Sequence, residues 1–152
     1  MKRVNLIDFI NEINVSLSKD SKVKEENNVS ELHAHKILFI IYGSFYEKFN
    51  KELFEPNFRA WRYGPVELDY REYKKKDYRN DVIKKFDFIL ESEEEEKFLE
   101  KIITRLLKFS PWSLVEYTHS LSAWKKNHKD DDSENFISKD DIFQSFKDRK
   151  FE

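Results

Sequence analysis

The 152-residue sequence has no cysteine, only two glycines and only three prolines. Without cysteine the chain forms neither a disulfide bond nor a thiolate zinc site, and such a composition is typical of reducing compartments. The longest apolar run, residues 37–42, is far below the roughly 20 residues of a membrane-spanning helix. Asp8 and Glu12 interrupt the apolar N-terminus before it reaches the length of a secretion signal. We therefore expect a soluble, cytoplasmic protein with no membrane partner.

An excess of basic residues is also missing. The chain has 28 Lys and Arg residues against 30 Asp and Glu residues, a formal net charge of −2, whereas nucleic-acid-binding proteins usually carry positive charge. A local basic cluster does lie beside three tyrosines: Lys74, Lys75, Lys76 and Arg79, next to Tyr70, Tyr73 and Tyr78. Lysines beside aromatic rings can contact phosphates and stack on bases. A helical nucleic-acid-binding transcriptional regulator is therefore the alternative function.

The sequence signatures of common enzymes are absent too. There is no glycine-rich phosphate loop, no HExxH and no GxSxG. His33 and His35 stand two positions apart, which on a helix directs them about 200° apart and prevents both from binding one metal ion. His119 is expected to be a hydrogen-bonded structural residue, and a hydrolase that pairs it with Glu116 or Asp69 is a weaker hypothesis. We predict no catalytic residue, no cofactor and no metal site.

What the chain does contain is 38% charged and 16% aromatic residues. This combination favours an interior of large rings beneath an ionic surface, and the length suits one domain over residues 1–152. We expect a mainly α, single compact helical domain. Apolar spacing and capping residues predict helices over 4–17, from about 30 to 50, from Pro65 or Val66, after Ser92, from Pro111 to about 127, and after Ser138.

A small β-hairpin or extended segment is expected at residues 52–63. Aromatic residues there are interrupted by Glu55, Pro56 and Asn57, a turn composition. Gly64 then permits a sharp turn, and proline suits the first turn of a helix, where its missing N–H is not needed.

The end of this segment holds two large rings around one arginine. In a regular strand Trp61 and Tyr63 lie on the same side and Arg62 on the other. We therefore predict that both rings face the core and that Arg62 faces solvent, where an arginine is a common anchor for a protein partner.

Two long strings occur in a characteristic order: LHAHKILFIIYGSFYEKFNKELFEPNFRAWRYGPV, residues 32–66, and LVEYTHSLSAWKK, residues 114–126. Together they resemble the Panacea domain of the SocA-like antitoxin family, which is often found in phage-associated proteins. His35 stands where that family has a glutamine, and Ala123 where a proline often precedes the tryptophan. The resemblance assigns a structural, motif-forming role to Trp61, Tyr63, Gly64, Pro65, Val66, Thr118 and Trp124.

The resemblance implies an antitoxin that neutralises a toxin by direct protein contact, with the toxin encoded next to it. In some members it implies delivery of the toxin to a protease. This function requires no catalytic group and no cofactor, only a stable scaffold with exposed aromatic, arginine or charged anchors. The residues that we expect to contact the partner are Arg62, Tyr70, Tyr73, Lys74, His119 and Lys125.

Overall fold

The computed structural model describes residues 1–18, 29–76, 83–130 and 135–151. Within these residues the chain forms seven α-helices and two antiparallel two-stranded sheets, which confirms a mainly α protein with a small hairpin. The elements are β1 (Lys2–Asn5), α1 (Leu6–Leu17), α2 (Glu31–Phe49), β2 (Phe58–Trp61), β3 (Gly64–Glu67), α3 (Leu68–Lys76), the 3-10 turn η1 (Lys84–Phe86), β4 (Asp87–Leu90), α5 (Glu93–Lys108), α6 (Pro111–His119), α7 (Ser122–Asn127) and α8 (Lys139–Asp148).

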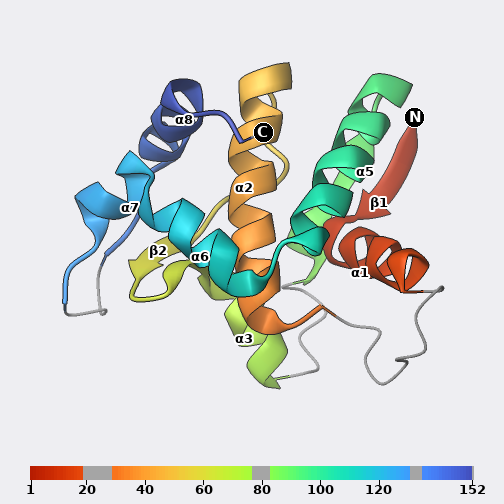
Figure 1. Ribbon diagram of the computed structural model, residues 1–152. Helices are drawn as coiled ribbons and strands as arrows, with labels where there is room; N and C mark the ends of the chain where they lie inside the picture. Colours follow the sequence, from red (N-terminus) through yellow and green to blue (C-terminus); the bar gives the residue numbers. More distant parts are fainter. Residues whose placement is uncertain (19–28, 77–82, 131–134, 152) are drawn as a thin grey trace.

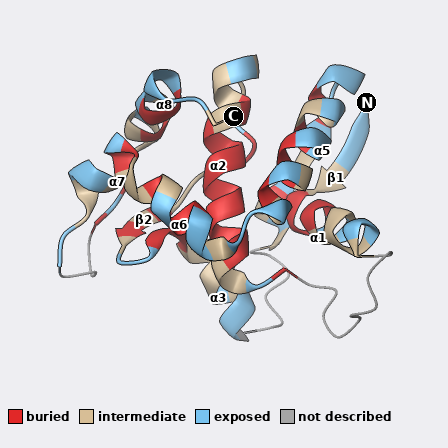
Figure 2. Ribbon diagram, in the orientation of Figure 1, coloured by how far each residue is buried: buried red, intermediate tan, exposed pale blue. Residues whose placement is uncertain are grey.

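Helix α2 is the central element, and it follows the sequence prediction closely. It begins after Ser30, whose hydroxyl accepts the N–H of His33, and ends at Asn50, which takes the left-handed conformation at φ 57°. Figure 1 shows α2 between α1, α5 and β1 on one side and α7, α8 and β2 on the other. Because it is covered from both sides, α2 is buried around almost its whole circumference (Figure 2).

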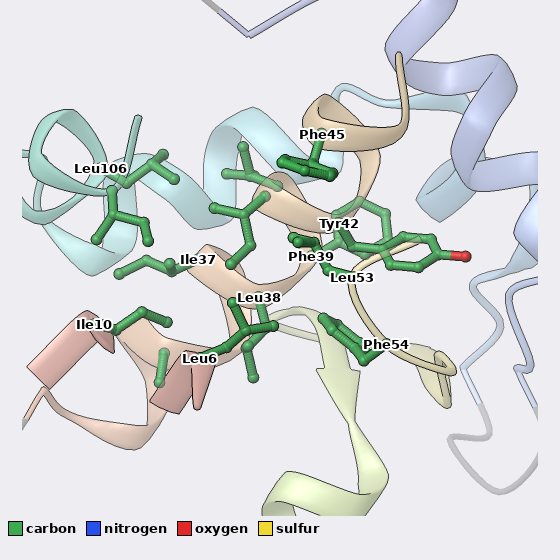
Figure 3. Packing of buried hydrophobic residues seen from close by; sticks show 14 of the residues in the cluster. Leu6, Ile10, Ile37, Leu38, Phe39, Tyr42, Phe45, Leu53, Phe54 and Leu106 are labelled. Carbon is green, nitrogen blue, oxygen red and sulfur yellow. The ribbon is translucent and has the colours of Figure 1, made fainter. Parts of the chain in front are cut away.

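The core forms around α2 from residues far apart in the sequence. Leu6 and Ile10 of α1 and Leu106 of α5 pack on one side of the helix, while Phe39 and Tyr42 project from α2 itself (Figure 3). Aromatic rings also pack around α2: Phe39 and Phe58 meet edge to face at 5.1 Å, and Tyr42 and Phe143 stack at 5.7 Å, both preferred geometries for rings in protein interiors. The layers on both sides of α2 therefore pack against this one helix.

The N-terminus differs from its prediction. Residues 2–5 form strand β1 and pair antiparallel with β4, from Lys2 opposite Leu90 to Asn5 opposite Asp87. Asn5 then caps α1 by accepting the N–H groups of Ile7 and Asp8. A strand of four residues offers too short an alternation of apolar and polar side chains to be distinguished from a first helical turn.

The hairpin lies a few residues further along the chain than expected. Strand β2 pairs with β3 from Phe58 opposite Glu67 to Trp61 opposite Gly64, with Arg62 and Tyr63 at the tip. Pro65 therefore belongs to a strand and does not begin a helix. Helix α3 begins instead at Leu68, just after Glu67, whose carboxylate accepts the N–H of Tyr70.

The predicted helix from Pro111 to residue 127 is two helices. Ser110 caps α6 as expected, but Leu121 is extended, with φ −85° and ψ 144°, and separates α6 from α7. The helices after Ser92 and Ser138 begin where the capping hydroxyls predict. No helix in the described part of the chain has both the length and the apolar character needed to cross a membrane.

Candidate functional site

The β2–β3 hairpin is held by side chains from α6, α7 and the residue after α7, which lie beside it in Figure 1. Three consecutive hairpin carbonyls each accept one ring N–H: Ala60 from His128 Nδ1 at 2.9 Å, Trp61 from Trp124 Nε1 at 2.7 Å, and Arg62 from His119 Nε2 at 2.9 Å. We call His119, Trp124 and His128 the hairpin clamp. Because the acceptors are carbonyl oxygens, each clamping nitrogen carries a proton.

The rings of the clamp also stack on one another. The Trp124 ring centroid lies 3.9 Å from that of His119 and 4.4 Å from that of His128, with nearly parallel planes. Burial lowers the pKa of His119, which favours the neutral ring. Trp124 therefore lies between two imidazoles, and rotation of its ring would disturb both. The clamp fixes the backbone of the hairpin just before its tip.

A buried lysine lies beneath the hairpin. Lys36 of α2 is fully buried, and its Nζ donates to the carbonyl of Pro65 at 3.0 Å. Burial lowers the pKa of Lys36 to about 7, because a low dielectric disfavours the charged ammonium. This hydrogen bond joins α2 to strand β3 and occupies one N–H donor of the amine.

Gly64 is required where Lys36 and α6 meet the hairpin. Its φ is +98°, a conformation that residues with a side chain rarely adopt. A Cβ there would lie 2.7 Å from Cε of Lys36 and 2.8 Å from Oγ1 of Thr118. Thr118 is fully buried and donates to the carbonyl of Val115. Lysine, glycine and threonine from three separate parts of the sequence thus converge on one point.

His35 and Glu67 form a second buried connection. His35 Nδ1 accepts the backbone N–H of Glu67 at 3.1 Å, and its Nε2 donates to Glu31 at 3.0 Å. Burial lowers the pKa of His35, so the ring is neutral, as an accepting Nδ1 requires. The glutamine of the Panacea pattern also carries an acceptor. His33 instead contacts the carbonyl of Leu106, so the two histidines serve separate partners.

Burial raises the pKa of the Glu67 carboxyl, an effect that the neighbouring Lys85 opposes. Glu67 is fully buried and accepts hydrogen bonds from Lys85 and from the backbone N–H groups of Asn57 and Tyr70. These bonds satisfy a carboxylate that would otherwise be costly to bury. They tie both ends of the hairpin to the start of α3.

A cavity of about 420 Å³ opens between α2, the start of α3 and the hairpin. Its walls include Glu31, Trp61, Arg62, Tyr63 and Arg71. The Arg71 guanidinium lies 5.2 Å from the centre of the Trp61 ring and 3.8 Å from a Glu31 oxygen. We call this space the hairpin cavity. It combines aromatic walls with two guanidinium groups, which suits polar recognition of a partner.

The tip of the hairpin exposes aromatic surface that the sequence did not lead us to expect. Tyr63 is 51% exposed and therefore does not face the core, because it belongs to the turn and not to a regular strand. Its ring meets that of Trp112, which is 56% exposed, edge to face at 5.3 Å. Trp61 is half-buried and Arg62 is exposed. Arg62, Tyr63 and Trp112 form what we call the tip surface.

The predicted contact residues are scattered. Lys74 and Lys125 are exposed, and Tyr73 is half-buried. Tyr70 is only 3% exposed, which corrects its prediction as a contact, because its ring packs against His35 in the core. Within the basic cluster, Tyr78 and Arg79 lie outside the described residues.

His119 belongs to the clamp and has no partner suited to catalysis among the described residues. Its Nε2 is occupied by the Arg62 carbonyl. Asp69, one proposed partner, contacts Asn57 and Lys85 instead. The other, Glu116, is exposed. The hydrolase hypothesis therefore loses its geometric basis within the described part of the chain.

Sequence reasoning missed Arg71, Trp112 and His128. Trp112 carried a signal, because it falls outside the apolar spacing of its helix and follows the capping pair Ser110 and Pro111. Arg71 and His128 carried no such signal in the sequence, since their roles depend on contacts with residues distant in the sequence.

A family model for the SocA-like antitoxin, Panacea domain, matches residues 35–125, more than half of the chain. The chain belongs to the SocA-like antitoxin family. The Panacea match begins in α2 and ends in α7, so it contains the hairpin, Lys36, Gly64, Thr118 and two of the three clamp residues. No curated protein and no solved structure matches the chain.

Proposed function

We propose that this protein is a cytoplasmic antitoxin that neutralises a partner toxin by binding it directly through the tip surface. The observation that carries the proposal is an exposed arginine and tyrosine at the tip of a hairpin whose backbone is fixed by the clamp, beside the exposed Trp112 ring of α6. Arginine, tyrosine and tryptophan are the commonest binding anchors. A fixed backbone reduces the entropy lost on binding. Membership of the antitoxin family supports a toxin as the partner in general.

The proposal concerns neutralisation by binding, which needs no catalytic residue in the antitoxin. Delivery of the toxin to a protease is a different mechanism, and the two have different consequences in the cell. Binding alone leaves the amount of toxin unchanged while growth is restored, whereas delivery lowers the amount of toxin.

Nucleic-acid binding has less support than protein binding. Lys74 and Lys75 on α3 are exposed and accessible to phosphate, but Asp69 and Glu72 lie on the same short helix. Association with nucleic acid depends on a local excess of positive charge. The aromatic and arginine composition of the tip surface is typical of protein interfaces.

The test is co-expression with the product of the adjacent gene, followed by growth, copurification and the amount of toxin. The full chain is expected to restore growth and to copurify with an undiminished amount of toxin. Arg62→Glu is expected to weaken the complex roughly 10-fold or more. Arg3→Glu, which reverses an exposed arginine on β1, is the matched control and should have no effect. Failure of the wild-type chain to bind or to rescue would contradict the proposal.

A further inference from the structure

The hairpin cavity lies between elements that hydrogen bonds join to one another. One wall is α2, which is joined to the hairpin by the Lys36 contact with Pro65 and by the His35 contact with the Glu67 N–H. The other walls are the hairpin itself and the start of α3. A ligand therefore meets side chains whose backbones are already fixed, so less conformational entropy is lost on binding.

The cavity carries more positive than negative charge. Its cationic groups are Arg62 and Arg71, Glu31 is its acidic group, and the buried amine of Lys36 has a lowered pKa of about 7. Lys36 already donates to Pro65, and Glu31 accepts from His35 at 3.0 Å but lies 3.8 Å from Arg71. At 3.8 Å the Arg71 contact is longer than a hydrogen bond. Most donors of Arg71 therefore remain available to another acceptor.

Arg62 adds a second available guanidinium. Its side chain is exposed and makes no ion pair or hydrogen bond with the described residues. A guanidinium presents donors in a planar fork that matches the two oxygens of a carboxylate. Two such groups beside one acidic side chain leave the cavity complementary to a single negative charge.

The aromatic wall supplies a third feature. Trp61 lies beneath the Arg71 guanidinium and limits its orientation. The indole Nε1 of Trp61 is buried and has no acceptor among the described residues. Buried donors without an acceptor are rare in folded proteins and call for an explanation. The residue that carries this unpaired donor lines the cavity.

We propose that the hairpin cavity receives an acidic side chain, aspartate or glutamate, from an apolar segment of the toxin. The carboxylate pairs with Arg71 and Arg62, and the flanking apolar side chains pack on Trp61 and Tyr63. A phosphate group fits less well, because its second charge would be repelled by Glu31 in the same wall. The inference rests on the proposed function and identifies which feature of the toxin is bound.

The first experiment measures the affinity of the purified toxin for full-length variants. Arg71→Gln removes the guanidinium and is expected to weaken the complex roughly 10-fold or more. Arg105→Gln is the matched control, because Arg105 also lies over an aromatic ring, Phe151, at 5.3 Å and does not line the cavity. Equal affinities for the two variants, with wild-type binding intact, would overturn the cavity proposal and leave the antitoxin function standing.

The second experiment uses a probe that does not depend on the toxin. The peptide acetyl-Leu-Glu-Leu-amide is titrated into the labelled full-length protein while the three tryptophan indole N–H resonances are followed. The Trp61 resonance, assigned with Trp61→Phe, is expected to shift far more than that of Trp124. The peptide with glutamine in place of glutamate is expected to cause little shift. Equal shifts with both peptides, or a Trp61 resonance that does not move, would overturn the proposal even if the toxin binds.

Discussion

The two small sheets of this protein have the same size but differ in how far they are buried. Each consists of two antiparallel strands of four residues, β1 with β4 and β2 with β3. An isolated two-stranded sheet is only marginally stable in water. In the β1–β4 sheet only Leu90 is buried, whereas β3 is buried throughout and β2 at alternate residues. What each sheet can do therefore depends on the contacts that surround it.

Apart from its exposed tip, the hairpin is held by contacts from several other parts of the chain. The clamp takes three of its carbonyls, Lys36 takes a fourth, and the segment from Asn135 to Ile137 closes the free edge of β2 through backbone hydrogen bonds. The β1–β4 sheet is tied to α5 by an exposed ion pair between Lys2 and Glu96. The comparison indicates that the hairpin backbone is held in place by many contacts, as the proposed binding role requires, and that the β1–β4 sheet closes one side of the core.

The largest loss of unfolding free energy is expected from Gly64→Ala. The new side chain must take a positive φ and lies too close to Lys36 and Thr118. Strain and overpacking together should lower the free energy of unfolding by about 4 kcal/mol. Urea denaturation measures the change, and Ile89→Ala in the exposed β4 should alter the free energy by less than about 0.5 kcal/mol. Similar small effects in both sheets would remove the contrast between them.

The second-largest expected change in stability comes from Lys36 and depends on pH. Burial lowers the pKa of Lys36 to about 7 in the folded protein from 10.5. Between these values the unfolded chain binds more protons, so stability rises with pH and falls as pH decreases toward 7. Relative to Lys36→Met, the wild type should gain up to about 3 kcal/mol of unfolding free energy between pH 7 and pH 9.5.

Urea denaturation of both proteins across this pH range isolates the contribution of Lys36, because other titrating groups are common to the two. Parallel pH profiles for wild type and Lys36→Met would mean that the amine does not titrate as a buried group.

A smaller effect is expected for the clamp. Trp124→Phe keeps an aromatic ring between the two histidines but loses the donor to the Trp61 carbonyl. The loss should cost about 1–2 kcal/mol of unfolding free energy, as expected for a half-buried acceptor left unpaired. Hydrogen exchange should rise in β2 and β3 and stay unchanged in β1 and β4. Trp112→Phe, at an exposed ring, serves as the control and should leave both measurements unchanged.

The smallest change in stability is expected for Lys2→Ala. Hydrogen bonding to Glu96 raises the pKa of Lys2, but the pair is exposed to solvent. Exposed ion pairs contribute little to stability, since water and salt screen them. The urea midpoint should not change measurably. A clear loss of stability would show that the β1–β4 sheet depends on this pair more than its exposure suggests.

Local signals predicted the long helices well. Ser30, Ser92 and Ser138 each cap a helix where their position in the sequence indicates, because capping depends on residues within one turn. The prediction of a helix start at Pro65 was wrong. It rested on the local preference of proline, which is overridden by pairing with Ala60 in the hairpin. Strand β1 was missed because its partner lies more than eighty residues away.

The site was predicted only in part. The family strings identified Gly64, Thr118 and Trp124, and the structure shows why they belong together: glycine allows close packing, and tryptophan holds the hairpin backbone. The hairpin cavity and the pairing of Tyr63 with Trp112 join residues from separate helices and strands. Neither spacing nor composition encodes such contacts, so they had to come from the structure.

The central claim is that the hairpin face binds the toxin, and hydrogen exchange of the purified complex tests it most directly. Compared with the free protein, the complex should show added protection at residues 61–64 and around Trp112, with none at residues 87–90. Added protection confined to the β1–β4 sheet, with unchanged exchange at the hairpin tip, would contradict the claim.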